Sequence, residues 1–149
     1  MQKAIVTIIS EVVLSGCASP QERQQRKSEN ATLRSRLSTA DENTTVTCSS
    51  KAMCEKAFSL AKVYVQMNGD MKVQFSDDTT ISTYNSLDYG YVALQATKTP
   101  QAGDSASIKL AASCKGMYSG SDLFFNMCAS KIAPAYEGFR PYVESRMAP

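Results

Sequence analysis

The sequence predicts an α+β fold with two layers, in which helices pack on one face of an antiparallel sheet. Three observations predict it. Apolar residues recur at helical spacing around residue 60 and again around residue 128, and four segments between these regions alternate apolar with polar residues. The connections between the four segments are short, which favours an antiparallel meander. Amphipathic helices bury their apolar sides well against the apolar face of such a sheet.

The first helix is expected over residues 50–68, in the stretch "SSKAMCEKAFSLAKVYVQMNGD". Ser49 or Ser50 is a suitable cap for its start. Asn68-Gly69 is suited to end it in a left-handed turn. The expected buried side of this helix comprises Cys54, Ala57, Phe58, Ala61, Tyr64 and Val65.

Four strands are expected next, over residues 71–75, 79–84, 91–97 and 105–114. The intervening stretches "SDD", "SLDYG" and "PQAGD" are typical of turns and loops. Each strand places its alternate apolar residues on one face, as a half-buried sheet requires.

A last helix is expected from about Asp122, capped by Ser121, with Phe125, Cys128 and Ile132 on its apolar side. Pro134 suits the first turn of a continuation. Pro141 is expected to kink or restart the helix, because proline lacks an N–H donor.

The N-terminus carries the pattern of an export signal. Lys3 is followed by the apolar run "AIVTIISEVVL" and then by "SGC". A run of about 11 residues is too short for a membrane-spanning helix, which needs about 20. Leu14-Ser15-Gly16-Cys17 resembles the lipobox of bacterial lipoprotein precursors. The resemblance implies cleavage before Cys17 and acylation of its thiol and of its new amino group.

This resemblance implies a place in the cell. Residues 1–16 would be the signal peptide, and lipid on Cys17 would anchor the chain to a membrane of the bacterial envelope. Ala18 stands where Asp would favour retention in the inner membrane, so we expect the outer membrane, facing the periplasm. Glu11 interrupts the apolar run and is expected to slow export, because a carboxylate inserts poorly into a bilayer.

Residues 17–47 are expected to form the lipidated cysteine and a flexible tether, with the folded domain over residues 48–149. The segment after Cys17 is rich in Gln, Ser, Thr and mixed charges, and its sparse apolar residues have no sustained period. A flexible chain of this length has an r.m.s. span of about 30 Å.

The other four cysteines form an even set that suits an oxidising compartment. Cys48 pairing with Cys54 and Cys114 pairing with Cys128 is the arrangement we favour. The alternative joins one of the first two to one of the second two, across the sheet, and sequence alone does not select between them.

The composition excludes several kinds of chemistry. The chain contains no His, which excludes Ser-His-Asp and Cys-His catalysis and imidazole ligands for a metal. The formal charge of +2 is too small to indicate nucleic-acid binding. Asp77-Asp78 is better explained as a turn than as paired catalytic carboxylates. We therefore expect no enzyme activity, no metal and no cofactor.

The remaining expectation is a binding role. Tyr84, Tyr89, Tyr91 and Tyr118 lie at or near predicted strand ends and turns, and Tyr is favoured at protein interfaces. The sequence is most consistent with a non-enzymatic lipoprotein whose domain binds a protein or an envelope polymer, or serves as an accessory subunit. The alternative is a periplasmic inhibitor or immunity-type protein that blocks a lytic enzyme.

Overall fold

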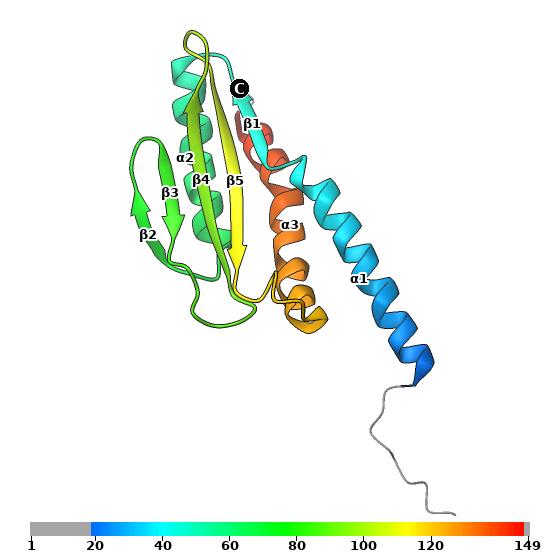
Figure 1. Cartoon of the computed structure of the whole chain (residues 1–149). Coiled ribbons are helices and arrows are strands. Elements are labelled where there is room, and N and C mark those ends of the chain that lie inside the picture. Colours follow the sequence, from blue (N-terminus) through cyan, green and yellow to red (C-terminus); the bar gives the residue numbers. More distant parts are fainter. Residues whose placement is uncertain (1–18, 148–149) are drawn as a thin grey trace, which may run out of the picture.

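The computed structural model describes residues 19–147 and confirms the α+β class (Figure 1). A central antiparallel sheet is accompanied by three helices. In chain order the elements are α1 (Pro20–Asp41), β1 (Thr45–Cys48), α2 (Lys51–Asn68), β2 (Val73–Ser76), β3 (Thr80–Thr83), β4 (Val92–Pro100), β5 (Ala106–Cys114) and α3 (Asp122–Met147).

The sheet has the strand order β1-β5-β4-β3-β2, and all its pairings are antiparallel. The four expected strands form the meander from β2 to β5. The fifth strand, β1, was not expected. It pairs with the first part of β5, from Thr45 opposite Lys109 to Cys48 opposite Ala106.

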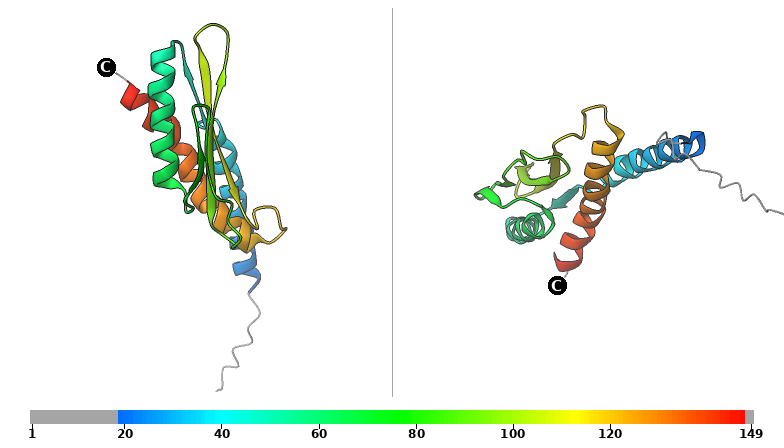
Figure 2. Two further views of the ribbon diagram at one scale, coloured as in Figure 1. Left: turned by 90° about the vertical axis from the view of Figure 1, so that its left-hand side faces the viewer. Right: turned by 90° about the horizontal axis from the view of Figure 1, so that it is seen from below.

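Two helices cover one face of the sheet. Figure 2 shows α2 and α3 on the same side of the strands when the sheet is seen edge-on. The core lies between these layers and contains Phe58, Val65, Ile81, Leu94, Ile108, Leu110, Ile132 and Phe139, all buried. The opposite face carries small polar side chains such as Thr45, Ser82, Gln95, Thr97 and Ser107, consistent with exposure to solvent.

The expectation of a flexible tether over residues 17–47 is wrong for most of that segment, because residues 20–41 form α1. Ser19 and Glu22 make a capping box: the Ser19 N–H donates to Glu22 Oε2 at 2.6 Å, and the Glu22 N–H donates to Ser19 Oγ at 3.2 Å. Pro20 occupies a first-turn position, where its missing N–H costs nothing. Residues 20–29 are exposed, so only the second half of α1 packs on the domain.

The limits of α2 match the sequence prediction more closely. Ser50 caps its start, and its hydroxyl accepts from the Met53 N–H. Gly69 caps its end with φ −84° and ψ 140°, an extended conformation rather than the expected left-handed one. The Gly69 N–H donates to the Val65 carbonyl at 3.1 Å, and the Asp70 N–H then donates to the Val92 carbonyl of β4 at 3.0 Å.

The last helix is longer and more continuous than expected. Helix α3 continues without a break through both Pro134 and Pro141. It packs against α2 around Tyr64, whose hydroxyl donates to the Ala135 carbonyl at 2.8 Å. Gly138 allows this approach, because a Cβ added there would lie 2.7 Å from Tyr64 Oη.

Two disulfides fasten the helices to the sheet. Cys48 at the end of β1 is joined to Cys54 in α2, and Cys114 at the end of β5 is joined to Cys128 in α3. This is the local pairing that the spacing favours. Each bridge fixes one helix where it meets a strand, which limits sliding between the two layers.

Candidate functional site

The edge of β5 is only partly covered. Strand β1 pairs with residues 106–109 of β5 and no further. Immediately before β1 the chain turns away into α1, and the last contact is the Leu110 N–H donating to the Thr44 carbonyl at 2.7 Å. Among the described residues, no strand covers residues 110–114 of β5 on this side. An uncovered strand edge presents unpaired backbone groups.

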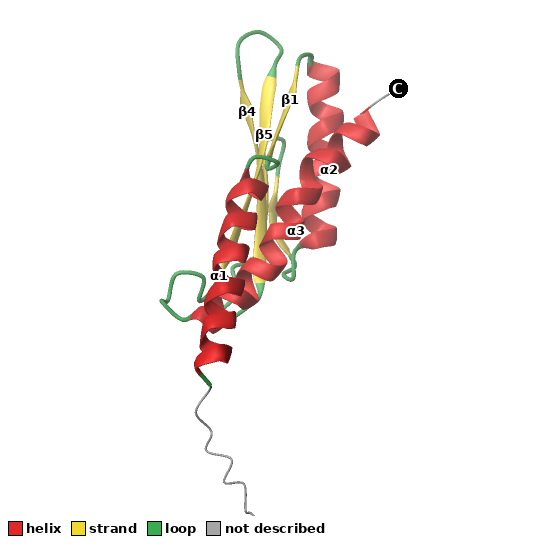
Figure 3. Cartoon of the chain, turned by 90° about the vertical axis from the view of Figure 1, so that its right-hand side faces the viewer, coloured by secondary structure: helices red, strands yellow, loops and turns green. Residues whose placement is uncertain are grey.

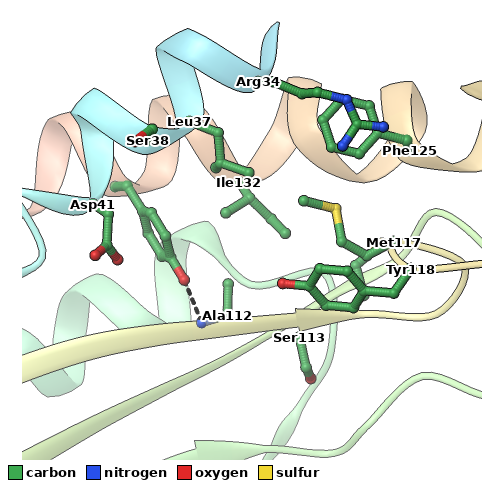
Figure 4. Close-up of a pocket in the computed structure, with 12 residues that line it drawn as sticks. Arg34, Leu37, Ser38, Asp41, Ala112, Ser113, Met117, Tyr118, Phe125 and Ile132 are labelled. Carbon is green, nitrogen blue, oxygen red and sulfur yellow. Dashed lines mark hydrogen bonds between the residues drawn. The ribbon is translucent and has the colours of Figure 1, made fainter. Parts of the chain in front are cut away.

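A groove of about 640 Å³ lies beside this uncovered edge. Figure 4 shows α1 on one side of the groove and β5 on the other. We call it the α1–β5 groove. Its apolar lining comprises Leu37, Ala112, Cys114, Met117, Phe125 and Ile132, and its polar lining comprises Arg34, Ser38, Asp41, Ser113, Tyr118 and Tyr136. Its size and mixed lining are typical of binding sites.

Contacts with α3 hold α1 in its place beside the groove. Figure 3 shows the two helices side by side. The guanidinium of Arg36 donates two hydrogen bonds to Glu137, each 2.6 Å long. This exposed pair raises the pKa of Arg36 and lowers the pKa of Glu137, in both cases chiefly through the hydrogen bonds.

Arg140 of α3 holds the junction between α1 and β1. Its side chain donates to the carbonyl of Thr45, at 3.0 Å from Nε, and also to the carbonyl of Glu42. Thr44, between them, is buried and its hydroxyl donates to the Asp41 carbonyl at 2.6 Å. The point at which the chain leaves the sheet edge is therefore fixed.

One side chain of α3 contacts the uncovered edge directly. The Ala112 N–H donates to the hydroxyl of Tyr136 at 3.0 Å, the dashed line in Figure 4. Burial raises the pKa of Tyr136, so its hydroxyl is neutral at pH 7. This hydroxyl occupies the place that a carbonyl of a neighbouring strand would take.

Two opposite charges lie along the α1 side of the groove. Arg34 stacks on the Phe125 ring, with its Cζ 4.0 Å from the ring centroid. Asp41 lies two turns further along the helix, and Figure 4 shows these two side chains at opposite ends of the groove. Within residues 19–147 neither side chain has an ion-pair partner.

Of the four tyrosines expected at an interface, the structure brings one to the groove. Tyr118 is 96% exposed and lines it. Tyr89 instead stacks on Phe124, with centroids 4.1 Å apart, and Tyr91 lies under the Lys131 ammonium. Tyr84 is half-exposed and does not line the α1–β5 groove.

The carboxylates of Asp77 and Asp70 have structural roles. Asp77 Oδ1 accepts from the Thr79 and Thr80 N–H groups at 2.7 and 2.6 Å, which confirms the turn and lowers the pKa of Asp77. Asp70 accepts from the Val92 N–H and from the Lys131 ammonium, at 2.8 and 2.9 Å. Although burial opposes them, these bonds lower the pKa of Asp70.

Residues 19–147 contain no cluster of three or more potential metal-ligating residues, and no helix among them is long and apolar enough to span a bilayer. Cys17 lies outside the described residues. The sequence prediction misses the groove, because it places Arg34, Leu37 and Asp41 in a tether. Their spacing of three and four residues was the available signal.

Comparison of the chain with protein-family models, with curated proteins and with solved structures gives no match.

Proposed function

We propose that this chain is a lipid-anchored protein of the bacterial envelope that binds a partner protein in the α1–β5 groove and has no catalytic activity. The observation that carries the proposal is the groove beside an uncovered strand edge. It combines an apolar lining with the charges of Arg34 and Asp41, which have no ion-pair partner among residues 19–147, and with an exposed tyrosine, Tyr118. Exposed Tyr and Arg beside an apolar lining are characteristic of protein interfaces.

The anchor rests on the lipobox-like Leu14-Ser15-Gly16-Cys17. The two disulfides support the same location in the bacterial envelope, because disulfides persist in oxidising compartments such as the periplasm. An acylated Cys17 would stand three positions before the start of α1 at Pro20. The exposed first half of α1, over residues 20–29, is about 15 Å long and would act as a stiff spacer between the outer membrane and the domain.

Photocross-linking in living cells tests the binding role. A benzoylphenylalanine at position 118 is expected to give a discrete protein adduct, and the same probe at exposed Leu87, outside the groove, is expected to give none. The groove is responsible if Ser38→Trp abolishes the adduct. Thr39→Trp is the matched control, because Thr39 is exposed on the same helix but does not line the groove.

The identity of the adduct decides what kind of binding protein this is. A lytic enzyme would make the protein an inhibitor or immunity-type protein, and a structural envelope protein would make it an accessory subunit. An adduct with lipid alone, or an adduct unaffected by Ser38→Trp, would refute the proposal.

A separate experiment tests the anchor. We expect Cys17→Ala to be neither acylated nor retained in the membrane fraction after cell lysis. Unchanged partition of this variant into the membrane would refute the lipobox interpretation and leave the groove untouched.

A further inference from the structure

We infer that the occupant of the α1–β5 groove is an extended peptide segment that adds to the sheet as a strand antiparallel to β5, with an acidic residue at Arg34 and a basic residue at Asp41. This inference rests on the proposed function, since it specifies how the partner is bound. Pairing of a guest strand with an exposed sheet edge is a general mode of peptide recognition.

The register of the sheet determines which backbone groups are available. The Leu110 N–H donates away from β4, toward Thr44. Because backbone groups alternate along a strand, those of Leu110, Ala112 and Cys114 lie on the groove side of β5. The Cys114 carbonyl is not available to a guest, because it accepts from the Met117 N–H at 3.2 Å. The Ala112 N–H contacts only Tyr136. The carbonyls of Leu110 and Ala112 accept no hydrogen bond from α1, α3 or any other described element on that side.

The sheet also sets the length and direction of the guest. Residues 110–114 extend over about 14 Å, which accommodates a guest of about five residues. Strand β1 runs antiparallel to β5 and begins opposite Lys109. A guest strand that lies in line with β1 along β5 and runs in the same direction as β1 would have its N-terminal residue beside Cys114 and its C-terminal residue beside Leu110. Antiparallel pairing is also slightly more stable per residue than parallel pairing.

The charges along the groove determine the order of charged residues in the guest. Arg34 lies at the end near Phe125 and Cys114, and Asp41 lies at the end near Tyr136 and Thr44. They are seven residues apart on α1, about 10 Å along its axis. In an antiparallel guest the acidic residue therefore precedes the basic residue. The distance of about 10 Å corresponds to about three positions along a strand, and the reach of the long Glu and Lys side chains allows a separation of four. Side chains four positions apart lie on the same face of a strand.

The hydroxyl of Tyr136 occupies the position that a backbone carbonyl of the guest would take. This hydroxyl satisfies the Ala112 N–H while the edge is empty, and it must release this N–H when a guest carbonyl takes its place. Removal of the hydroxyl leaves the N–H unpaired in the empty groove. Since an unmade hydrogen bond is costly, Tyr136→Phe should bind a strand about three- to tenfold more tightly than the wild type.

The test uses the purified full-length protein and two capped, fluorescently labelled peptides. The first is Ser-Glu-Thr-Val-Thr-Lys-Ser, which presents Glu, Val and Lys to the groove. The second exchanges Glu and Lys, which is also the exact reversal of the sequence. Fluorescence anisotropy should show that the first binds at least threefold more tightly, and that Tyr136→Phe tightens its binding. Tyr142→Phe, on the same helix but outside the groove, is the matched control.

A double variant, Arg34→Asp with Asp41→Arg, should reverse the preference between the peptides. Equal binding of the two peptides, binding of neither, or unchanged affinity in Tyr136→Phe would overturn strand addition. The adduct from position 118 reports separately on the proposed function. If the adduct forms but the protein binds the two peptides equally, the partner binds in the groove but does not add to the sheet as a strand. The proposed function would then stand, and the present inference would be wrong.

Discussion

Replacement of Gly138 by Ala should destabilise the protein, although the same change usually stabilises a helix. Alanine is favoured over glycine inside a helix by about 1 kcal/mol. At this position, however, the new Cβ would lie 2.7 Å from Tyr64 Oη. The buried hydroxyl would then lose its 2.8 Å hydrogen bond to the Ala135 carbonyl, at a cost of about 1–3 kcal/mol. We expect a net loss of about 1 kcal/mol.

The sign of the effect should reverse when the hydroxyl is removed first. In Tyr64→Phe the nearest ring atom would lie 3.7 Å from the new Cβ, an ordinary contact distance. Gly138→Ala should therefore stabilise that background by up to about 1 kcal/mol. The coupling between the two substitutions is then about 2 kcal/mol, well above the error of additivity for independent sites.

Urea unfolding of the wild type, the two single variants and the double variant measures this cycle. A gain in stability from Gly138→Ala in the wild type, equal to the gain in the Phe background, would show that the hydroxyl does not meet Gly138. The described packing of α2 on α3 would then be incorrect.

Four further predictions address other contacts. Asp70→Asn should cost about 1 kcal/mol at pH 7. Because the folded pKa of Asp70 is depressed below its ordinary 3.8, the wild type should lose this advantage as the pH falls below about 4, and equal sensitivity of both proteins to acid would contradict this. Replacement of Cys114 and Cys128 by Ala should lower the unfolding free energy by about 3 kcal/mol; a loss below 1 kcal/mol in urea would argue against the bridge. Asn30→Leu should raise the urea midpoint by the equivalent of about 1 kcal/mol, because Asn30 Oδ1 is buried without a hydrogen-bond partner; a lower midpoint would show that the amide is satisfied. Glu11→Ala should speed precursor maturation in a pulse–chase experiment, and equal rates would show that Glu11 is harmless.

The meander and the helices that cover it could be predicted because their signals are local. Strict alternation in β5 and a capped helical period in α2 identify the buried faces without knowledge of the fold. The spacing of the four later cysteines favoured the pairing that is present, because each pair is close in sequence.

The groove could not be predicted, because both of its walls depend on distant contacts. Most of α1 is polar, and its packing on α3 depends on a few residues such as Leu33, Leu37 and Ala40. Strand β1 has four residues and is defined by its pairing with β5, about 60 positions later. The position of Tyr136 against Ala112 follows only once α3 is docked on the sheet.

The most direct test of the account is amide hydrogen exchange, measured on the adduct captured from position 118 and on the free protein. Strand addition predicts that the partner slows exchange in residues 110–114 of β5 and leaves β2 and β3, at the other edge of the sheet, unchanged. Protection confined to β2, β3 or α2, with residues 110–114 exchanging as in the free protein, would contradict it.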